Sequence, residues 1–389
     1  MIDPAARCHP LYAAMPTTVF EHMSGLAREA GAINLGQGFP DDPPPAALAE
    51  AAARALRERS QQYPPMAGLP ELRDAIAAFY RRRQGLDLTR EHVIVTSGAT
   101  EAVAAAILAT IQPGDEVLVL APAYDAYAPL VRRAGGVPVF VPLAPPAWAL
   151  PLAALRAAIT PRTRALIFND PLNPTGTVAS PAECAALANL CVEADLLAIC
   201  DEVWEMVRFD APAHRSLMAE PGMADRTIKI GSAGKIFGAT GWKVGWIVAD
   251  PALATVVGRA HQFLTFTTPP MLQWALAEGL ADDAMMDRQV RAWAASRAVL
   301  NEGLAQAGFA VLPNVATWFS CVDLARSGIE LDDMTFAERA VREAGVATIP
   351  LSALWEGPDA PRQIVRLCHC KPAAMLEEAV RRLADFHQA

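Results

Sequence analysis

A glycine-rich segment, residues 231–246, contains two lysines whose surroundings could support covalent chemistry. Lys235 follows an apolar run and lies among small residues, and Lys243 comes later in the same segment. Glycines let a backbone approach a ligand closely, and a lysine kept from water can lose its proton and form a Schiff base with a carbonyl. The other lysine could hold a phosphate. The pair therefore indicates a site for pyridoxal 5′-phosphate (PLP), an aldehyde that carries a phosphate, unless the segment is only a surface loop.

Two polar residues near other apolar runs would complete such a site. Asp201 directly follows the run at residues 196–200. Its carboxylate could simply cap a turn, but beside PLP it would keep the pyridine nitrogen protonated. Asn173 lies in a turn rich in Pro, Gly and Asn, residues 169–176, from which its amide could bind the ring hydroxyl and a substrate carboxylate.

A third group of residues could bind the phosphate. Gly98, Ala99 and Thr100 open an expected helix directly after an expected strand. The free N–H groups at a helix start form an anion site, which Ser232 and Lys243 would complete. The threonine and the serine could also be simple helix caps, a role that is compatible with phosphate binding.

Tyr124 and Arg366 could complete the contacts with cofactor and substrate. Tyr124 follows the run at residues 117–120 and could stack on the pyridine ring or pack in the core. Arg366 interrupts the apolar run at residues 364–368, and a buried guanidinium requires an anionic partner. A substrate α-carboxylate matches its planar fork, and an internal salt bridge is the alternative.

The elements that must position these residues alternate along the chain. Short apolar runs, which we expect to form buried strands, are separated by helical segments, which predicts an α/β fold with a largely parallel sheet and helices on both faces. Ligands bind beyond the carboxyl ends of such strands, where the candidate residues fall. We predict three parts: an N-terminal arm with part of a small domain (1–45), a large PLP-binding domain (46–282) and a small α+β domain (283–389). The runs occupy residues 93–96, 117–120, 137–140, 165–168, 196–199, 227–230 and 244–248.

The composition bounds the class of protein. The chain has 389 residues, of which 53% are hydrophobic and 19% charged, as in a globular protein. Its formal net charge of −9, without a basic stripe, argues against nucleic acid or an anionic membrane as partner. The sequence shows neither a membrane-spanning run nor a signal peptide, so we expect a cytoplasmic protein.

The cysteines do not suggest a metal site. In Cys368-His369-Cys370, adjacent positions of a strand would point to opposite faces, and the usual Cys-x-x-Cys spacing is missing. We therefore expect no metal there, and thiols rather than disulfides in a reducing compartment.

Taken together, these segments resemble the class I aminotransferases of PLP-dependent fold type I over nearly the whole chain. They are most similar to the subgroup of kynurenine aminotransferase, glutamine transaminase K and bacterial methionine aminotransferases. That fold has a large domain with a mostly parallel sheet flanked by helices and a smaller α+β domain. The matching motifs occupy residues 33–41, 173–176, 200–203, 232–235 and 241–246.

The resemblance implies a role for each matched residue. Lys235 would carry the cofactor and move the proton, and Asp201 would hold the pyridinium. Arg366, with the backbone of Gly36 nearby, would bind the α-carboxylate. Tyr124 would stack on the ring, and Asn173 would contact the ring hydroxyl. The phosphate would be held by Gly98, Ala99, Thr100, Ser232 and Lys243.

The resemblance also implies a homodimer with shared active sites. Tyr63 would reach the phosphate in the neighbouring subunit, and Phe266 belongs to a stretch that meets the neighbour's substrate. Phe266, and Phe39 if it also faces the substrate, would favour a large apolar or sulfur-containing side chain. Trp204 departs from the pattern, because the family usually has tyrosine at this position of the cofactor site. An indole can donate but not accept a hydrogen bond, so we expect an altered basicity of the cofactor-linked lysine.

The implied reaction is transfer of the amino group of an L-amino acid, of methionine, aromatic, kynurenine or glutamine type, to a 2-oxo acid through Lys235. The alternative is a cysteine-S-conjugate β-lyase, which would release pyruvate and ammonia without any acceptor. A PLP-binding regulator would need a DNA-binding segment, and no basic helix-turn-helix precedes residue 33. A scaffold without activity is disfavoured because Lys235, Asp201 and Arg366 are all present.

Overall fold

A seven-stranded sheet forms the centre of the computed structural model, which describes residues 4–357 and 359–388. β8 runs antiparallel to its neighbours β2 and β7, and the other strand pairs are parallel. The prediction of an α/β fold with a largely parallel sheet is therefore confirmed. In spatial order the strands are β2 (Val93–Thr96), β8 (Gly245–Val248), β7 (Thr227–Ser232), β6 (Leu197–Asp201), β5 (Thr163–Asn169), β3 (Glu116–Ala121) and β4 (Val137–Pro142).

Helices cover both faces of this sheet, because successive strand residues point to opposite sides and both sets are apolar. Ile167 and Ile199 pack on one side, and Leu166 and Ala198 on the other. The first side is covered by α5 (Ala99–Thr110), α6 (Tyr127–Arg133) and α10 (Pro251–Leu264). The second is covered by α4 (Pro70–Gln84), α8 (Pro181–Glu193) and α11 (Pro270–Gly279), with α3 (Ala46–Glu58) against α11 and α7 (Leu152–Ala158) near β4.

The edge strand β4 differs from the sequence expectation. Residues 137–140 were expected to form a buried strand, yet Val137 is 49% exposed and only the Val141 side chain of β4 is fully buried. The reason is its position: β4 pairs with β3 alone and lies at the end of the sheet. An apolar run indicates a strand but does not reveal whether the strand has one neighbour or two.

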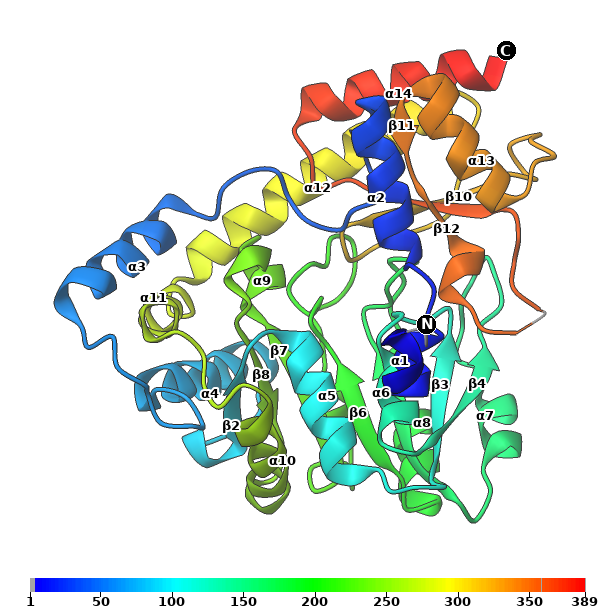
Figure 1. Cartoon of the computed structure of the whole chain (residues 1–389). Coiled ribbons are helices and arrows are strands. Elements are labelled where there is room, and N and C mark those ends of the chain that lie inside the picture. Colours follow the sequence, from blue (N-terminus) through cyan, green and yellow to red (C-terminus); the bar gives the residue numbers. More distant parts are fainter. Residues whose placement is uncertain (1–3, 358, 389) are drawn as a thin grey trace.

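A second group of elements lies beside the carboxyl ends of the large sheet (Figure 1). Its four-stranded antiparallel sheet has the order β12-β13-β10-β9, and the parallel pair β1-β11 joins the N-terminal region to the C-terminal one. The division into parts at residues 45 and 282 stays a prediction. The strands are β1 (Ile33–Asn34), β9 (Ala310–Val311), β10 (Phe319–Asp323), β11 (Val346–Ala347), β12 (Ile349–Pro350) and β13 (Ile364–Cys368).

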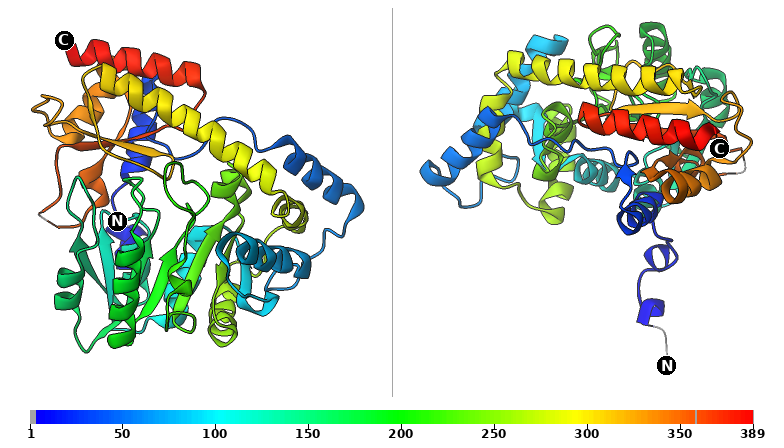
Figure 2. Two further views of the ribbon diagram at one scale, coloured as in Figure 1. Left: turned by 180° about the vertical axis from the view of Figure 1, so that it is seen from behind. Right: turned by 90° about the horizontal axis from the view of Figure 1, so that it is seen from above.

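Four helices, three of them long, surround this second group. The long helix α12 (Asp283–Gln306) begins where the Asp282 side chain accepts from the Met285 N–H at 2.8 Å, and α14 (Ala373–Gln388) packs along it. The others are α2 (Val19–Ala30) and α13 (Asp333–Arg339). The short helix α1 (Pro10–Ala13) projects from the body of the molecule in the view from above (Figure 2). Within the described residues, no helix combines the length and apolar character needed to cross a membrane.

Candidate active site

A cavity of about 500 Å³ opens at the carboxyl ends of the large sheet, between that sheet and β10 and β13. The ends of β2, β3, β5, β6 and β7 meet at this edge, and the antiparallel β8 begins there. Residues far apart in the sequence therefore converge on one space. Twelve of the predicted site residues line it: Phe39, Gly98, Ala99, Thr100, Tyr124, Asn173, Asp201, Trp204, Ser232, Lys235, Lys243 and Arg366.

Lys235 projects into the cavity from α9 (Ala233–Ile236), the single helical turn that follows β7. Its Nζ lies 3.4 Å from the Gly38 carbonyl oxygen, and above the rings of Trp204 and Trp318 at 4.7 and 5.0 Å from their centroids. Burial lowers the pKa of Lys235 to about 8, although the charges of Cys370, Cys368 and Asp201 act in the opposite direction. A fraction of this lysine is therefore neutral near pH 8, in the form that can attack a carbonyl or accept a proton.

Asp201 is the last residue of β6 and is held from two sides. The Tyr127 hydroxyl donates to its Oδ2 at 2.6 Å, and the Val203 N–H donates to its Oδ1 at 3.3 Å. Burial raises the pKa of Asp201, and these two hydrogen bonds oppose the effect. Sequence reasoning missed Tyr127. The available signal was its place three residues after Tyr124, at the start of α6.

The start of α5 has the geometry that could hold an anion. Gly98 precedes the helix with a φ of +82°, and a Cβ there would come within 3.3 Å of the Lys243 Nζ. A Cβ on Gly245 would lie 2.8 Å from the Ala99 nitrogen. Glycine at these two positions thus allows free helix N–H groups and an ammonium group to converge, with Ser232 in the same cavity wall.

The Arg366 side chain is 1% exposed and reaches the other end of the cavity from β13. Its Nη1 donates to the Asn173 Oδ1 at 3.0 Å, and its Nη2 to the Gly36 carbonyl at 2.7 Å. Both partners are neutral, and within the described residues no carboxylate forms an ion pair with this guanidinium. Burial lowers its pKa to about 10. The buried charge is thus available to an anion that enters the cavity, and Asp125, which sequence reasoning also missed, lines the same space.

Aromatic side chains form much of the remaining wall. Trp204 packs edge to face on Trp318 and Phe319, with centroids 4.9 and 5.3 Å apart. Phe20 from α2 and Phe39 from the loop after β1 also line the cavity. Side chains from α2 and from this loop give the space an apolar side that could receive a large apolar group. The sequence signal for Phe20 was absent, because its approach depends on how the N-terminal helix packs.

Three predicted residues do not line the cavity of the single chain. Gly36 contributes indirectly, through its carbonyl oxygen on Arg366. Tyr63 is 83% exposed, and its ring packs edge to face on Phe266 at 5.6 Å. These two aromatics therefore share an outer surface near the end of α10, and their roles in a neighbouring subunit stay predictions.

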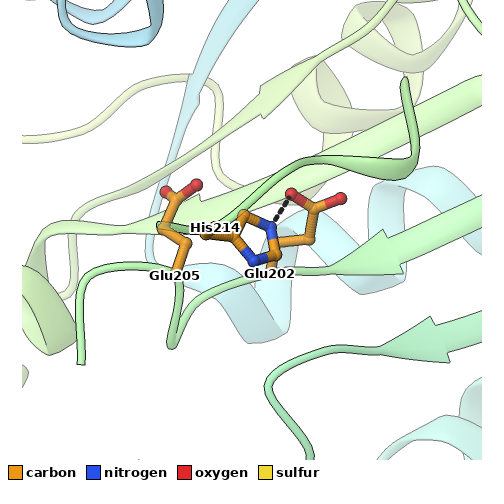
Figure 3. Close-up of side chains that lie close together, drawn as sticks. All are labelled: Glu202, Glu205 and His214. Atoms are coloured by element: carbon orange, nitrogen blue, oxygen red, sulfur yellow. Dashed lines mark hydrogen bonds and ion pairs between the residues drawn. The ribbon is translucent and has the colours of Figure 1, made fainter. Parts of the chain in front are cut away.

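A buried cluster of Glu202, Glu205 and His214 has the residue types of a metal site (Figure 3). The Lys229 ammonium, however, donates to both carboxylates, with its Nζ 2.6 Å from the Glu205 Oε2, and the His214 Nε2 lies 2.7 Å from the Glu202 Oε2. Burial disfavours ionisation of Glu202, but Lys229 and His214 outweigh it and lower the pKa to about 2. The lysine takes the place that a metal cation would need, so we assign the cluster to an ion-pair network.

Comparisons with known proteins relate the whole chain to one family. A family model described as "Aminotransferase class I and II" matches residues 30–383. A Mycobacterium tuberculosis protein named "Probable N-succinyldiaminopimelate aminotransferase DapC" is 44% identical over 380 residues, which cover 95% of this chain and 96% of that protein. The solved structure of the N-succinyldiaminopimelate aminotransferase from this organism superimposes with a TM-score of 0.94 at 44% identity, covering 97% of this chain and 99% of that one.

Two further relatives carry other substrate names. The methionine aminotransferase of Escherichia coli is 37% identical over 378 residues, which cover 95% of this chain and 96% of that protein. The kynurenine–oxoglutarate transaminase 1 of Rattus norvegicus is 33% identical over 397 residues, which cover 93% and 94%. These matches confirm the resemblance that the sequence motifs indicated.

Proposed function

Because this chain belongs to the class I and II aminotransferases, we propose that it binds PLP and moves the amino group of an L-amino acid to a 2-oxo acid. The observation that carries this proposal is the single cavity that gathers Lys235, Asp201 and Arg366. A basic amine, a buried carboxylate and a buried guanidinium then lie within one space, as a reaction on an amino acid requires.

The cavity residues fit both the phosphate group and the ring nitrogen of PLP. The helix start at Gly98, together with Lys243, suits a phosphate, and the cradle depends on glycine at positions 98 and 245. Asp201, which Tyr127 orients, suits a protonated ring nitrogen. When bound, PLP supplies an aldehyde carbon and an electron-accepting ring.

The chain's own residues would then bind and orient the reactants. Arg366 holds the α-carboxylate of the amino acid through its planar fork, while Asn173 and the Gly36 carbonyl fix the guanidinium in place. Lys235, with its lowered pKa, would accept the proton from the substrate Cα and deliver it to the carbon that comes from the cofactor aldehyde. Tyr124 and the Trp204 indole line the cavity and would hold the cofactor ring between its walls.

The walls favour a large, mainly apolar substrate side chain. Phe20, Phe39 and Phe319 line the cavity, and the cations in its described lining are the three already assigned to cofactor and α-carboxylate. We therefore propose donors of the methionine, aromatic, kynurenine or glutamine type. N-succinyldiaminopimelate is a second candidate, favoured by the 44% identity to the Mycobacterium tuberculosis protein, but its distal carboxylate would need a cation from outside this lining.

We further propose a homodimer whose subunits complete each other's sites. Tyr63 and Phe266 pack together on an exposed surface, Phe263 is exposed near the end of α10, and the projecting α1 offers an arm for a second copy (Figure 2). Tyr63 would reach the neighbour's phosphate and Phe266 its substrate.

An absorbance experiment tests the proposal. Purified protein with added PLP should show a visible band, and excess L-methionine without any 2-oxo acid should convert it to the near-ultraviolet band of pyridoxamine phosphate. N-succinyl-L,L-diaminopimelate, L-kynurenine and L-glutamine then rank the donors by conversion rate. Absence of any band would contradict PLP binding, and a persistent band with pyruvate released from a cysteine S-conjugate would indicate β-elimination instead.

A further inference from the structure

Cys368 and Cys370 form a buried pair of thiols at the end of β13, behind the active site. Their sulfur atoms are 3.2 Å apart, which places them in direct contact. β13 ends at Cys368, and Cys370 lies two residues beyond that end, while His369 between them packs against Phe209. Sequence reasoning weighed this segment only as a metal site and did not predict the contact between the two cysteines.

The two thiols are not equivalent. Burial would raise the pKa of Cys368, but the hydrogen bond from Cys370 and the charges of Lys371 and Arg366 outweigh it and lower the pKa to about 7. Burial and the neighbouring Cys368 raise the pKa of Cys370. The contact between the two sulfurs and the opposite directions of their pKa shifts suit an attacking and a resolving cysteine. Burial instead raises the pKa of Cys191 on α8 to about 12.

This pair lies within electrostatic reach of Lys235. Both thiols pack in the same buried cluster as Trp204 and Trp318, whose rings lie beneath the Lys235 Nζ. A negative charge on either sulfur raises the pKa of Lys235. Neither sulfur lines the cavity of about 500 Å³, and Cys368 and Cys370 are 0% and 2% exposed, so a hydroperoxide reaches them only through an opening of the wall behind Trp204.

We propose that Cys368 and Cys370 are an oxidisable dithiol next to the active site, which hydroperoxides convert to a disulfide. The Cys368 thiolate attacks the peroxide O–O bond, forms an S–O bond and releases an alcohol or water, leaving a sulfenic acid. The Cys370 sulfur then attacks the Cys368 sulfur, the S–S bond forms and water leaves. Two thiols and one hydroperoxide thus give one disulfide, one alcohol and one water, and a small dithiol reverses the change.

The consequence for activity rests on the proposed aminotransferase function. A disulfide removes the negative charge that faces Lys235 and pulls the two sulfurs closer together. Removal of that charge lowers the pKa of Lys235 and by itself favours its neutral form. The closer approach of the sulfurs displaces the end of β13, the strand that carries Arg366, and we expect this displacement of the substrate contact to dominate. We expect turnover to fall on oxidation and to return on reduction.

Thiol counting on the PLP-loaded protein tests the modification without reference to activity. The exposed Cys8 is replaced by serine, which leaves six of the seven cysteines. Treatment with hydrogen peroxide should remove two thiols, and the peptide that contains Cys368 and Cys370 should lose two hydrogens in mass. Dithiothreitol should restore both thiols and the turnover. Retention of all six thiols, or loss mapped to other cysteines, overturns the proposal.

Matched variants distinguish the roles of the two cysteines. Cys370→Ser should stop at the sulfenic acid, with one thiol lost and one oxygen gained on Cys368, and Cys368→Ser should lose no thiol under the same treatment. Cys191→Ser, a buried cysteine on α8 without this contact, should still lose two. Cys370→Ala serves if the serine variant fails to fold. An unchanged two-thiol loss in either Cys370 variant contradicts the proposal. Two-thiol loss with full turnover retains the modification but removes its regulatory consequence.

Discussion

Lys229 and Lys235 stand close together in the sequence, and the structure gives them opposite chemistry. Lys229 in β7 is fully buried, and its ammonium contacts Glu202, Glu205 and the ring of Tyr80. Burial would lower the pKa of Lys229, but the two carboxylates outweigh it and raise the pKa above its ordinary value. Lys235 is partly buried at the cavity wall, where aromatic rings and a carbonyl oxygen surround its ammonium group, and desolvation lowers its pKa to about 8.

The difference shows that the partner, more than burial, sets the basicity of a lysine. Two carboxylates in contact compensate the desolvation of Lys229, whereas the rings of Trp204 and Trp318 compensate little of that of Lys235. Strand alternation separates the two environments, since Asp201 at the end of β6 faces the cavity and the adjacent Glu202 faces the ion-pair network. One lysine therefore stabilises the fold, and the other is available for reaction.

Among the variants that test the difference between the two lysines, replacement of Lys235 should have the largest effect, which is a loss of turnover. In Lys235→Ala we expect turnover to fall by about 10²–10⁴-fold, the range for a positioned acid–base group. Because no carboxylate is left unpaired and burial disfavours the charged form of Lys235, the free energy of unfolding of the PLP-free protein should not fall and should rise at neutral pH. Steady-state rates measure the loss of turnover, and urea unfolding measures the stability. A large loss of stability would contradict the proposed division of roles between Lys235 and Lys229.

Replacing Lys229 should act on stability instead. In Lys229→Met, Glu202 and Glu205 remain buried without their cation, which should cost about 3–5 kcal/mol in the free energy of unfolding. Urea unfolding measures this cost, and the folded fraction should still bind PLP and show its visible band. Combining Lys229→Met with Glu202→Gln and Glu205→Gln should recover part of the loss. A cost below about 1 kcal/mol, the range of an exposed ion pair, would contradict the role of the network.

The comparison also shows how far the sequence predicts the site. Convergence of the site could be predicted because the ends of parallel strands meet at one edge, and Asp201, Ser232 and Lys235, which were chosen for their chemistry, all follow or end such runs. The partners of Lys229 could not, because its contact with Glu202 and Glu205 depends on the register of β6 against β7, in which Cys200 lies opposite Lys229. Apolar residues flank Lys229 in the sequence and give no sign of a carboxylate.

Side-chain direction explains the other misses. Tyr127 reaches Asp201 only because the turn after β3 leads directly into α6, and Phe20 reaches the cavity only because α2 packs over it. The prediction that Arg366 needs an anion was drawn from its burial, and the structure supplies two neutral oxygens instead. Periodicity reveals which residues are buried, whereas the identity of their contacts depends on packing between distant segments.

A smaller effect is expected in the pH dependence of stability of the PLP-free protein. The folded pKa of Lys235 is about 8, below the ordinary value of 10.5, so between these values the unfolded chain binds more protons and stability should rise with pH. The slope contributed by this one group is at most about 1.4 kcal/mol per pH unit. Lys229, whose pKa is raised, contributes its full stabilisation below 10.5 and loses it only at higher pH. Urea unfolding at pH 7–10 should therefore show a rise that Lys235→Met removes, and an identical slope in both proteins would contradict the lowered pKa.

The smallest effect concerns Trp204, whose ring lies 4.7 Å from the Lys235 Nζ. An indole face favours the charged amine more strongly than a phenol ring does, so Trp204→Tyr should lower the pKa of the cofactor-linked lysine. A tyrosine hydroxyl that bonds the ring hydroxyl of PLP would act in the same direction. We expect the midpoint of the visible absorbance titration to fall by about half a pH unit.

The variant Trp204→Phe, which has no hydroxyl, separates the two causes. A fall equal to that of the tyrosine variant assigns the effect to the ring. A smaller fall assigns the remainder to the hydroxyl. Equal midpoints in the parent protein and in both variants would show that Trp204 does not contribute to the difference in pKa between Lys235 and Lys229.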